Sequence, residues 1–362
     1  MKFIDEYREP ELGKKLVKRI EHLSTRPVRL MEFCGGHTVA IIKNGLRQLL
    51  PPTIEMLSGP GCPVCVTANA DIDRAIALAR LPDVIITTFG DMLKVPGSYS
   101  SLQQARAQGG DIRIVYSTQD ALQIARDNPG RSVIFIGIGF ETTAPTIAAA
   151  ILQAEAEKLK NFYVLCLLKL CPPVMKSLLD LGEIKLDGIV CPGHVSAIIG
   201  SRPYEFIPRD YGVACVVSGF EALDILLTVA MLVEQIEAGK PRVEIAYRRS
   251  VKPEGNVTAL QLIDRVYEAD KAGWRGIGEI PGSGLKLRKA YEHFDAALAF
   301  PMTLEPVCEA RGCICGDILR GVKTPADCKL FRKVCTPENP VGPCMVSSEG
   351  ACAAHYMYGA GV

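Results

Sequence analysis

Two short segments of the chain combine cysteine with glycine, histidine and proline in patterns suited to thiol or metal chemistry. The first is Cys34-Gly35-Gly36-His37, and the second is the run Gly-Pro-Gly-Cys-Pro-Val-Cys at residues 59–65. Each follows an apolar, strand-like run and precedes a helical pattern, which is where an open α/β sheet holds its ligands. A thiol and an imidazole in one loop, with a Cys-x-x-Cys pair in the other, predict soft-metal binding or thiol redox chemistry.

Cys62 and Cys65 form the Cys-x-x-Cys pair, and a helix is expected directly after them over residues 67–80. The positive end of a helix lowers the pKa of a nearby thiol, so the first cysteine is expected to be nucleophilic. The alternative is a pair of buried structural cysteines or half of a zinc site. Zinc would need another pair at similar spacing, and the sequence holds no second Cys-x-x-Cys.

Cys34 and His37 share a loop whose two glycines let the backbone approach a ligand closely. The imidazole can assist the thiolate or bind metal. A buried cysteine with a capping histidine is the alternative for either residue alone. A cysteine protease would take its base from a distant segment, and nothing else in the chain supports proteolysis.

The first of these loops has an echo later in the chain. Residues 34–42 match residues 191–199 at six of nine positions, so Cys191 and His194 correspond to Cys34 and His37. Because each copy follows an expected strand, the echo favours two related α/β domains. A cleft between two such domains is the natural place for a site.

A third glycine-containing loop, at residues 137–145, also follows an expected strand and opens a helix. It lacks the Walker lysine and the full dinucleotide glycine pattern, which argues against nucleotide binding. Glu141 in this loop is a candidate hydrogen-bonding group of the cleft, or else a first-turn residue favoured by the helix dipole.

The C-terminal segment is rich in cysteine, since seven of the 14 cysteines lie from Cys308 to the C-terminus. This segment is poor in long periodic runs, so it is expected to need a metal or cluster to fold firmly. Ligation of an iron–sulfur cluster needs four thiolates and little secondary structure, whereas a zinc ribbon prefers two tight knuckles. An iron–sulfur cluster is therefore favoured, although spacing alone leaves open which four bind among Cys308, Cys313, Cys315, Cys328, Cys335, Cys344 and Cys352.

The elements that must position these residues alternate between strands and helices. The chain opens on a helical pattern over residues 1–25, and helices are further expected at 71–80, 119–126, 146–159 and 256–268, with a loop at 279–284. Such alternation with short connections predicts right-handed βαβ units and parallel sheets. The expected strands lie at residues 28–33, 53–57, 84–88, 112–116, 133–138, 162–167, 188–191 and 213–217.

Length and composition limit the class of protein. A chain of 362 residues is too long for one ordinary core. We expect an α/β domain over residues 1–130, a related α/β domain over 131–300, and a small cysteine-rich iron–sulfur domain over 301–362. The net charge of +1 argues against a large nucleic-acid surface. The longest apolar segment carries Asp224 and Glu234 and is too short for a membrane span.

Acidic residues stand where a signal peptide would have its apolar stretch, so the protein is expected in the cytoplasm. In that reducing compartment the cysteines are interpreted as metal ligands, reactive thiols or core residues, and not as a disulfide framework.

Taken together, these motifs resemble those of the hydrogenase maturation factor HypD family. The resemblance covers essentially the whole chain. It rests on the Cys34–His37 loop, the run at 59–65, Gly139-Phe140-Glu141-Thr142-Thr143, Cys191-Pro192-Gly193-His194 and the cysteine-rich tail. In that family, cysteines in the pattern Cys-x₁₄-Cys-x₆-Cys-x₁₆-Cys hold a [4Fe–4S] cluster, and Cys313, Cys328, Cys335 and Cys352 reproduce this pattern. The resemblance thereby leaves Cys315 and Cys344 as a cluster-adjacent thiol pair and Cys308 without a role.

The resemblance also implies a function. Proteins of this family work with a small chaperone, HypC, to carry an iron ion while it receives two cyanides and one carbon monoxide. Cyanide comes from the carrier HypE, and the finished group passes to the large subunit of a [NiFe]-hydrogenase. By this resemblance Cys34 binds the iron, His37 orients or protonates near it, and Cys62 and Cys65 exchange electrons with the cluster.

Two other functions remain open on the sequence. A cluster-dependent disulfide reductase would use Cys62 and Cys65 as its exchange pair and would turn over small disulfides by itself. A simple iron–sulfur electron carrier would need no Cys34–His37 loop. An assembly scaffold with redox activity is preferred to either.

Overall fold

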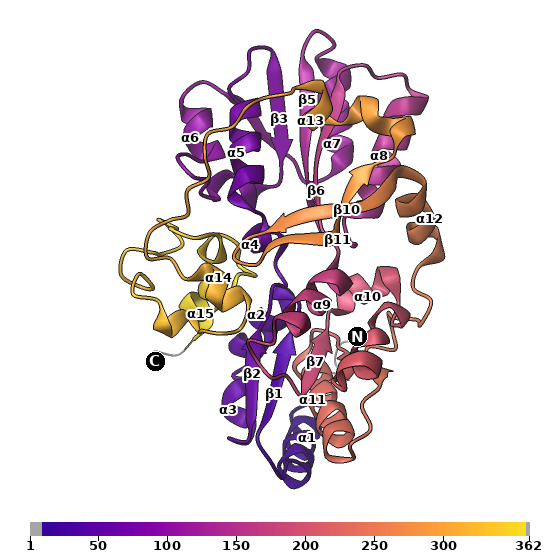
Figure 1. Ribbon diagram of the computed structural model, residues 1–362, viewed down its shortest axis with the longest axis vertical. Coiled ribbons are helices and arrows are strands. Elements are labelled where there is room, and N and C mark those ends of the chain that lie inside the picture. Colours follow the sequence, from indigo (N-terminus) through magenta and orange to yellow (C-terminus); the bar gives the residue numbers. More distant parts are fainter. Residues whose placement is uncertain (1–8, 360–362) are drawn as a thin grey trace.

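The computed structural model describes residues 9–359 and contains two parallel β-sheets, an antiparallel hairpin and a cysteine-rich C-terminal region (Figure 1). The α/β class expected from the sequence is therefore confirmed. The first eight residues of the helix expected at 1–25 lie outside the described residues. The remainder forms α1 (Pro10–Leu23). No helix within residues 9–359 is long and apolar enough to cross a membrane.

The first sheet has five parallel strands. Their order is β2 (Ile54–Ser58), β1 (Val28–Glu32), β7 (Gly188–Cys191), β8 (Ala214–Val217) and β9 (Val243–Ile245). Helix α11 (Ala222–Glu237) packs against β7 and β8, and α1 packs against α11. Buried leucine, isoleucine and valine side chains of these elements form one core cluster.

The second sheet has four parallel strands. Their order is β4 (Asp111–Ile114), β3 (Val84–Thr88), β5 (Ser132–Gly139) and β6 (Phe162–Leu168). Helix α7 (Thr118–Asp127) packs against β5 and against α8 (Ala144–Ala156). Strand β5 is buried along nearly its whole length, as expected for a central strand covered on both faces.

The remaining elements are shorter or lie between the sheets. The α-helices are α2 (Gly35–Lys43), α3 (Leu46–Leu49), α4 (Pro63–Val66), α5 (Asn69–Leu78), α6 (Leu102–Ala107), α9 (Cys171–Leu181), α10 (Gly193–Ile199), α12 (Val257–Val266), α13 (Ala296–Ala299), α14 (Cys315–Leu319) and α15 (Ala351–Tyr358). Single 3₁₀ or π turns lie at Gly90–Lys94, Arg202–Tyr204, Ile207–Tyr211, Lys289–Phe294, Pro325–Asp327 and Pro343–Met345.

The strand pairing differs from the expected division of the chain at residue 130. Strands β1 and β2 share a sheet with β7, β8 and β9, which come much later in the chain, while β3 to β6 form the other sheet. The two sheets are therefore interleaved in sequence. The sequence echo lies within one of them, because β1 pairs directly with β7, so it does not mark two related domains.

An antiparallel hairpin, β10 (Tyr267–Trp274) and β11 (Gly278–Leu287), crosses between the two sheets (Figure 1). The loop expected at 279–284 is thus part of a strand, which is a correction. The register shifts between Asp270 and Ala272, and Gly282 has φ +64°. Pro281 and Gly282 therefore lie where the strand pairing is irregular. Proline and glycine are also typical of loops, which is why the sequence predicted a loop at this position.

The loops after β1 and β2 pack backbone against backbone. The N–H of Gly35 donates to the carbonyl oxygen of Gly61 at 3.0 Å. A Cβ atom at Gly61 would overlap the backbone nitrogen and Cα of Cys34. The absence of a side chain at Gly61 therefore allows the two cysteine loops to meet.

Gly61→Ala is predicted to destabilise the protein, because the new methyl group must push apart two backbone segments that no rotamer change can move. We expect a loss of about 1–3 kcal/mol in the free energy of unfolding, measured by urea denaturation. Gly130→Ala is the matched control, since no atom lies within 4 Å of its Cβ position. Equal stability of the two variants would contradict the close packing of the loops.

Candidate functional site

Cys34 stands at the start of α2, directly beyond the carboxyl end of β1. Its Sγ accepts hydrogen bonds from the backbone N–H groups of Gly36 and His37. Burial raises the pKa of the thiol to about 12, and the nearby carboxyl groups of Glu349 and Glu32 act in the same direction. The thiol is therefore protonated at neutral pH, unless a metal cation replaces the proton.

His37 lies one helical turn from Cys34 and is completely buried. Within the described residues neither ring nitrogen has a hydrogen-bond partner, although the backbone of Ser218 and Gly219 lies near the ring. The ring stacks on Phe220 at a centroid distance of 4.7 Å. Burial lowers its pKa to about 4, so the imidazole is neutral at pH 7 and one ring nitrogen can bind a metal or accept a hydrogen bond.

The echo residue His194 stacks on Phe220 at 3.8 Å, so Phe220 lies between the two histidines. Cys191 is completely buried in β7. The two copies of the Cys-x-Gly-His pattern thus line one end of one sheet.

Cys62 is the N-cap of the short helix α4, and Cys65 lies within that helix. The longer helix α5 begins at Asn69, within the expected range 67–80. The two sulfur atoms are 2.7 Å apart, longer than the roughly 2.05 Å of a disulfide bond, and both cysteines are free. The sulfur of Cys62 accepts the backbone N–H of Cys65 at 3.3 Å, and burial raises the pKa of Cys65 well above its usual range.

The hairpin β10–β11 ends in residues that are hydrogen bonded to the segment following Cys65. The backbone N–H of Arg275 donates to the carbonyl of Val66 at 2.9 Å, and its Nε donates to the carbonyl of Thr67 at 3.0 Å. Trp274, the preceding residue, is buried, and its ring stacks on that of Phe140 with the centroids 6.0 Å apart. The cysteine pair is therefore fixed by a segment from a distant part of the chain.

The Cys34 loop and the Cys62 loop share one site, as expected. The Gly35–Gly61 hydrogen bond and its flanking backbone bonds limit the Cα atoms of Cys34 and Cys62 to a separation of about 10 Å. Cys171, at the start of α9 beyond β6 of the second sheet, interacts electrostatically with Cys34. The carboxyl ends of both sheets therefore face the same interior.

Glu141 lies in this interior with Cys171. One of its carboxylate oxygens accepts the backbone N–H of Cys171 at 2.9 Å, and the other, Oε2, is buried with no partner in the described residues. Burial raises the pKa of Glu141 to about 7. The carboxyl group can therefore take up or release a proton near neutral pH.

A chain of thiols leads from Cys62 into the C-terminal region. The thiol of Cys344 lies near those of Cys65 and Cys315, close enough for the neighbouring thiols to perturb one another's pKa. Cys65 also contacts the carbonyl oxygen of Pro343, 3.7 Å from its sulfur. Cys62, Cys65, Cys344 and Cys315 therefore form a continuous series of free, buried thiols.

The four cysteines expected to hold a cluster lie together beyond Cys315. The thiol of Cys352 interacts electrostatically with those of Cys313, Cys328 and Cys335. Burial raises the pKa of Cys313 to about 12 and that of Cys352 well above its usual range, so both thiols would ionise only against a bound cation.

This donor set fits a [4Fe–4S] cluster, in which each thiolate binds its own iron. Among the described residues, no three His, Cys, Asp or Glu side chains are placed to share a single metal ion.

Sequence reasoning missed two carboxyl groups beside Cys34. Glu32 accepts the N–H of Cys34 at 2.9 Å and a hydrogen bond from the Thr38 hydroxyl, and burial raises its pKa to about 7. Glu349, from the C-terminal region, packs so tightly that a Cβ at Gly35 would lie 2.5 Å from its own Cβ. A charged residue at an otherwise buried strand position was the available signal for Glu32, whereas no local signal marks Glu349.

Comparison with known proteins gives one consistent result. A family model described as "HypD: Hydrogenase formation hypA family" matches residues 11–359. The chain is 47% identical over 366 residues to hydrogenase maturation factor HypD of Escherichia coli K12, covering 99% of this chain and 98% of the relative. It is 47% identical over 370 residues to the protein of the same name from Cupriavidus necator, covering 99% and 97%.

Hydrogenase maturation factor HypD2 of Bradyrhizobium diazoefficiens is 49% identical over 369 residues, again covering 99% of this chain and 97% of the relative. The motifs that carry the resemblance and the matches over nearly the whole length agree. The chain belongs to the HypD family of hydrogenase maturation factors.

Proposed function

We propose that this maturation factor is the scaffold on which the Fe(CN)₂CO group of a [NiFe]-hydrogenase is assembled. A HypC-like chaperone would share the iron, a HypE-like protein would donate cyanide, and the hydrogenase large subunit would receive the product. The observation that carries the proposal is the meeting of Cys34, the Cys62–Cys65 pair and the cysteine-rich tail in one buried region. These three features come from distant parts of the chain.

Cys34 is the proposed ligand of the cargo iron. A thiolate suits an electron-rich iron that carries cyanide and carbon monoxide. Most coordination positions of such an iron are taken by the small ligands, so one protein thiolate and one from a partner suffice. Because the Cys34 thiol has a pKa of about 12, binding of iron would displace its proton. The carboxyl group of Glu32, which accepts the N–H of Cys34 and has a pKa of about 7, is placed to take up that proton, and the neutral His37 would orient the site.

The thiols between Cys34 and the tail would move electrons in pairs. A [4Fe–4S] cluster on Cys313, Cys328, Cys335 and Cys352 would, when bound, supply electrons one at a time. Cys315 and Cys344, as a dithiol, would reduce a Cys62–Cys65 disulfide by thiol–disulfide exchange. In that exchange the first pair becomes a disulfide, and two electrons and two protons pass to the second pair.

The burial of the exchange pair favours a scaffold over a general disulfide reductase. Cys62 and Cys65 are 3% and 0% exposed, so a disulfide of a soluble substrate cannot reach them without movement of the surrounding loops. A simple electron carrier would have no use for the free imidazole of His37 beside Cys34.

The cluster assignment predicts about four irons and four sulfides per anaerobically prepared chain. Cys328→Ala or Cys335→Ala should remove the brown colour and loosen the C-terminal region, because binding energy there is also folding energy. Cys315→Ala and Cys344→Ala are the matched controls and should keep the cluster. Iron and sulfide analysis with visible absorption measures this, and full content in Cys328→Ala would show the assignment to be wrong.

The scaffold function predicts that Cys34→Ala keeps the fold and the cluster but loses the additional iron and all maturation activity. Infrared spectroscopy of the anaerobically purified protein with its small partner is the direct readout, because metal-bound cyanide and carbonyl absorb where proteins do not. Cys191→Ala, the equivalent change in the echo, is the control and should retain the bands. His37→Ala should weaken activity less completely, since water partly replaces an orienting group.

Cyanide and carbonyl bands of normal intensity in Cys34→Ala would contradict this role. Their absence from the unaltered protein with its partner would contradict the scaffold function as a whole.

A further inference from the structure

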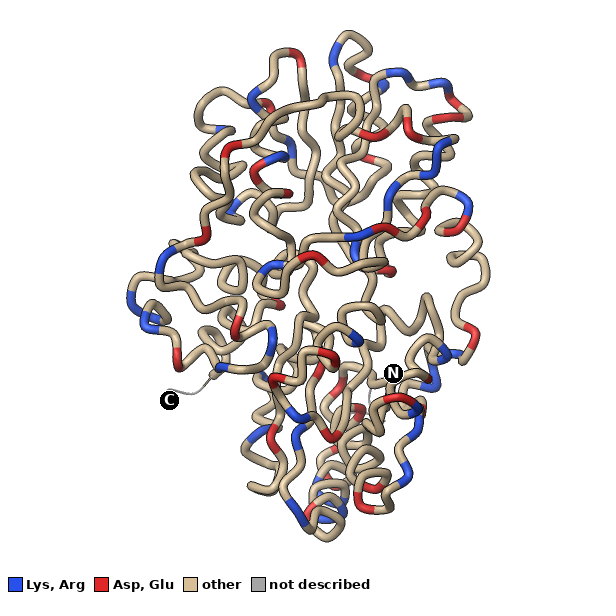
Figure 2. The backbone as a smooth tube through the Cα atoms, viewed as in Figure 1, with Lys and Arg blue, Asp and Glu red and all other residues tan. Residues whose placement is uncertain are grey.

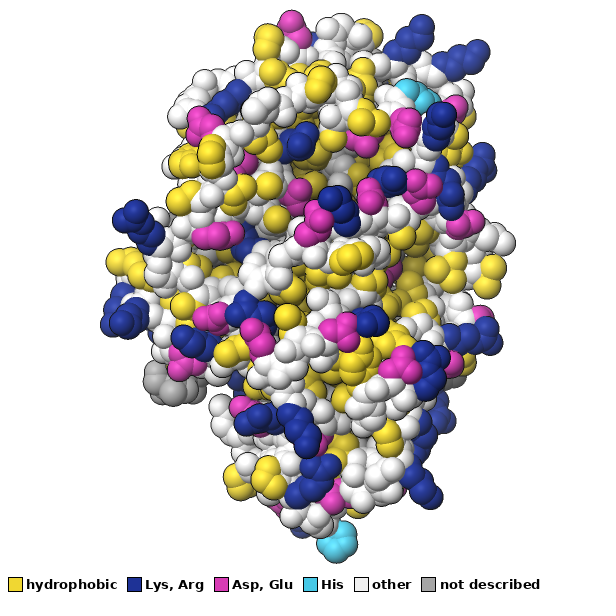
Figure 3. All heavy atoms as spheres, in the orientation of Figure 1, with side chains coloured by type: hydrophobic (Ala, Val, Ile, Leu, Met, Phe, Trp, Pro, Cys, Tyr) yellow, Lys and Arg dark blue, Asp and Glu magenta, His cyan; other side chains and the backbone are white. Residues whose placement is uncertain are grey.

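The outer edge of the C-terminal region carries a concentrated positive charge. Residues 323–333 contain more basic than acidic side chains, whereas the whole chain has a net charge of only +1. Basic positions of the backbone (Figure 2) and basic side chains (Figure 3) gather along this edge, away from the two sheets. The charge is therefore local, and it lies where the tail faces solvent.

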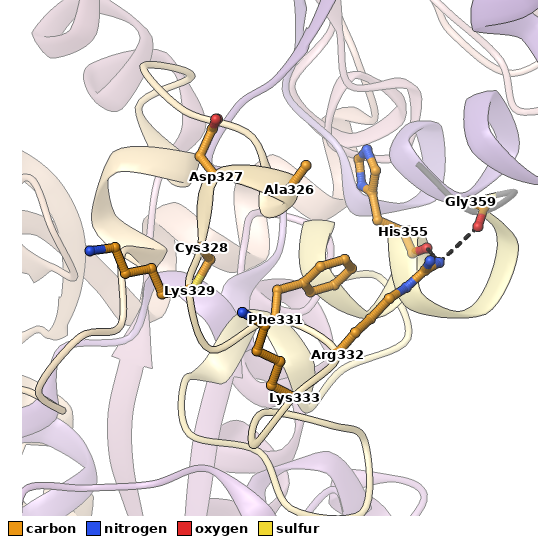
Figure 4. Close-up of a pocket in the computed structure, with 9 residues that line it drawn as sticks. All are labelled: Ala326, Asp327, Cys328, Lys329, Phe331, Arg332, Lys333, His355 and Gly359. Atoms are coloured by element: carbon orange, nitrogen blue, oxygen red, sulfur yellow. Dashed lines mark hydrogen bonds between the residues drawn. The ribbon is translucent and has the colours of Figure 1, made fainter.

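A surface cavity of about 410 Å³ lies within this edge, and the expected cluster ligand Cys328 is part of its wall (Figure 4). The cavity is lined by Ala326, Asp327, Cys328, Lys329, Phe331, Arg332, Lys333, His355 and Gly359. Cys313 and Cys328 are partly exposed, whereas Cys335 and Cys352 are buried. Of the four ligands expected to hold the cluster, Cys328 is the one that lines this cavity.

The basic residues of the cavity fall into two groups. Arg332 donates to the carbonyl oxygens of His355 at 3.0 Å and Gly359 at 2.8 Å, so it caps the end of α15. Lys329 and Lys333 are exposed, and no acidic side chain of residues 9–359 lies within ion-pair distance of either. In Figure 4 both lysines extend away from the end of Arg332 that binds α15.

Apolar groups accompany the two lysines. Phe331 lines the cavity together with the two lysines, its ring is edge-on to that of Tyr356 with the centroids 6.4 Å apart, and Val334 next to Lys333 is 53% exposed. Aromatic side chains are enriched at protein-binding surfaces, and a patch of one charge steers and orients a partner of the opposite charge. A nucleic-acid surface would need a longer basic stripe than these few residues provide.

We propose that the surface formed by Cys328, Lys329, Phe331 and Lys333 is the docking site of a small acidic electron-carrier protein. The inference rests on the proposed function, because it places the carrier beside the expected cluster. Unpaired lysines attract and orient an acidic partner, and contact at Cys328 minimises the distance an electron must travel. Two carriers in turn would each lose one electron, and a Cys62–Cys65 disulfide would gain both electrons and two protons to become two thiols.

The test uses an acidic flavodoxin as the probe and the anaerobically purified protein with its cluster. Binding of the oxidised flavodoxin is measured by calorimetric titration at low and moderate salt, and oxidation of its hydroquinone form by stopped-flow absorbance. Lys329→Glu/Lys333→Glu should weaken binding and slow oxidation at least about tenfold at low salt, with a smaller salt dependence. Reaction with a small zwitterionic viologen should not change.

Lys15→Glu/Lys18→Glu is the matched control, since it makes the same change of net charge on the exposed side of α1, at the far end of the molecule (Figure 1). Equal losses in the two double variants, or no loss in either, would overturn the docking surface. So would equally tight binding of a double-stranded oligonucleotide at the same two lysines. Iron analysis distinguishes failure of the proposed function from failure of the docking surface. A chain that holds no cluster overturns the proposed function. A full cluster together with unchanged flavodoxin binding in Lys329→Glu/Lys333→Glu overturns only the docking surface.

Discussion

Burial of free thiols is the constraint on which the rest of the structure depends. A thiol in an apolar interior cannot ionise, because the thiolate loses its hydration, and the raised pKa values of Cys34, Cys65 and Cys352 follow from this. Such thiols are inert until a metal cation or a sulfur–sulfur bond replaces the proton. Burial therefore suppresses unspecific reactivity and, under the proposed function, would reserve the thiols for iron and for one another.

The fold achieves this burial by making three separate parts of the chain meet. The carboxyl ends of two parallel sheets supply the loops of Cys34, Cys62 and Cys171, and the C-terminal region covers them with Cys344 and Glu349. The contacts are made by backbone at Gly35 and Gly61, where any side chain would separate the segments. Under the proposed function, an iron site with few protein ligands would need this enclosure, because the small ligands of the iron would have to be kept from water and from exchange.

Much of the local structure was predictable from the sequence. Strands such as β3 and β7 were expected at the residues where they lie, because short β-branched runs bounded by glycine and aspartate leave little alternative. The cysteine loops were correctly placed at strand ends. Asn256 caps α12 as its side-chain chemistry suggests, accepting the N–H of Ala259 at 3.1 Å.

The remaining features depend on contacts between distant residues. The pairing of β1 with β7 joins segments that lie far apart in the sequence, and no local pattern encodes it. The bulged strand β11 carries proline and glycine, so its local chemistry resembles that of a loop. Glu349 lies at the site only because it packs against Gly35, and the sequence around Glu349 gives no sign of that contact. These features were fixed by packing and topology, which act after local preferences.

The central claim is that Cys62, Cys65, Cys344 and Cys315 form one continuous thiol series beside Cys34. Differential alkylation with mass spectrometry, after mild oxidation of the folded protein, tests it most directly. The account predicts disulfides between Cys62 and Cys65 and between Cys315 and Cys344, with Cys65–Cys344 as the exchange intermediate and Cys191 and Cys215 left as thiols. Recovery of Cys62 and Cys65 as free thiols when the oxidised protein is unfolded and alkylated without reductant, or a disulfide joining either of them to a cysteine outside the series, would contradict it.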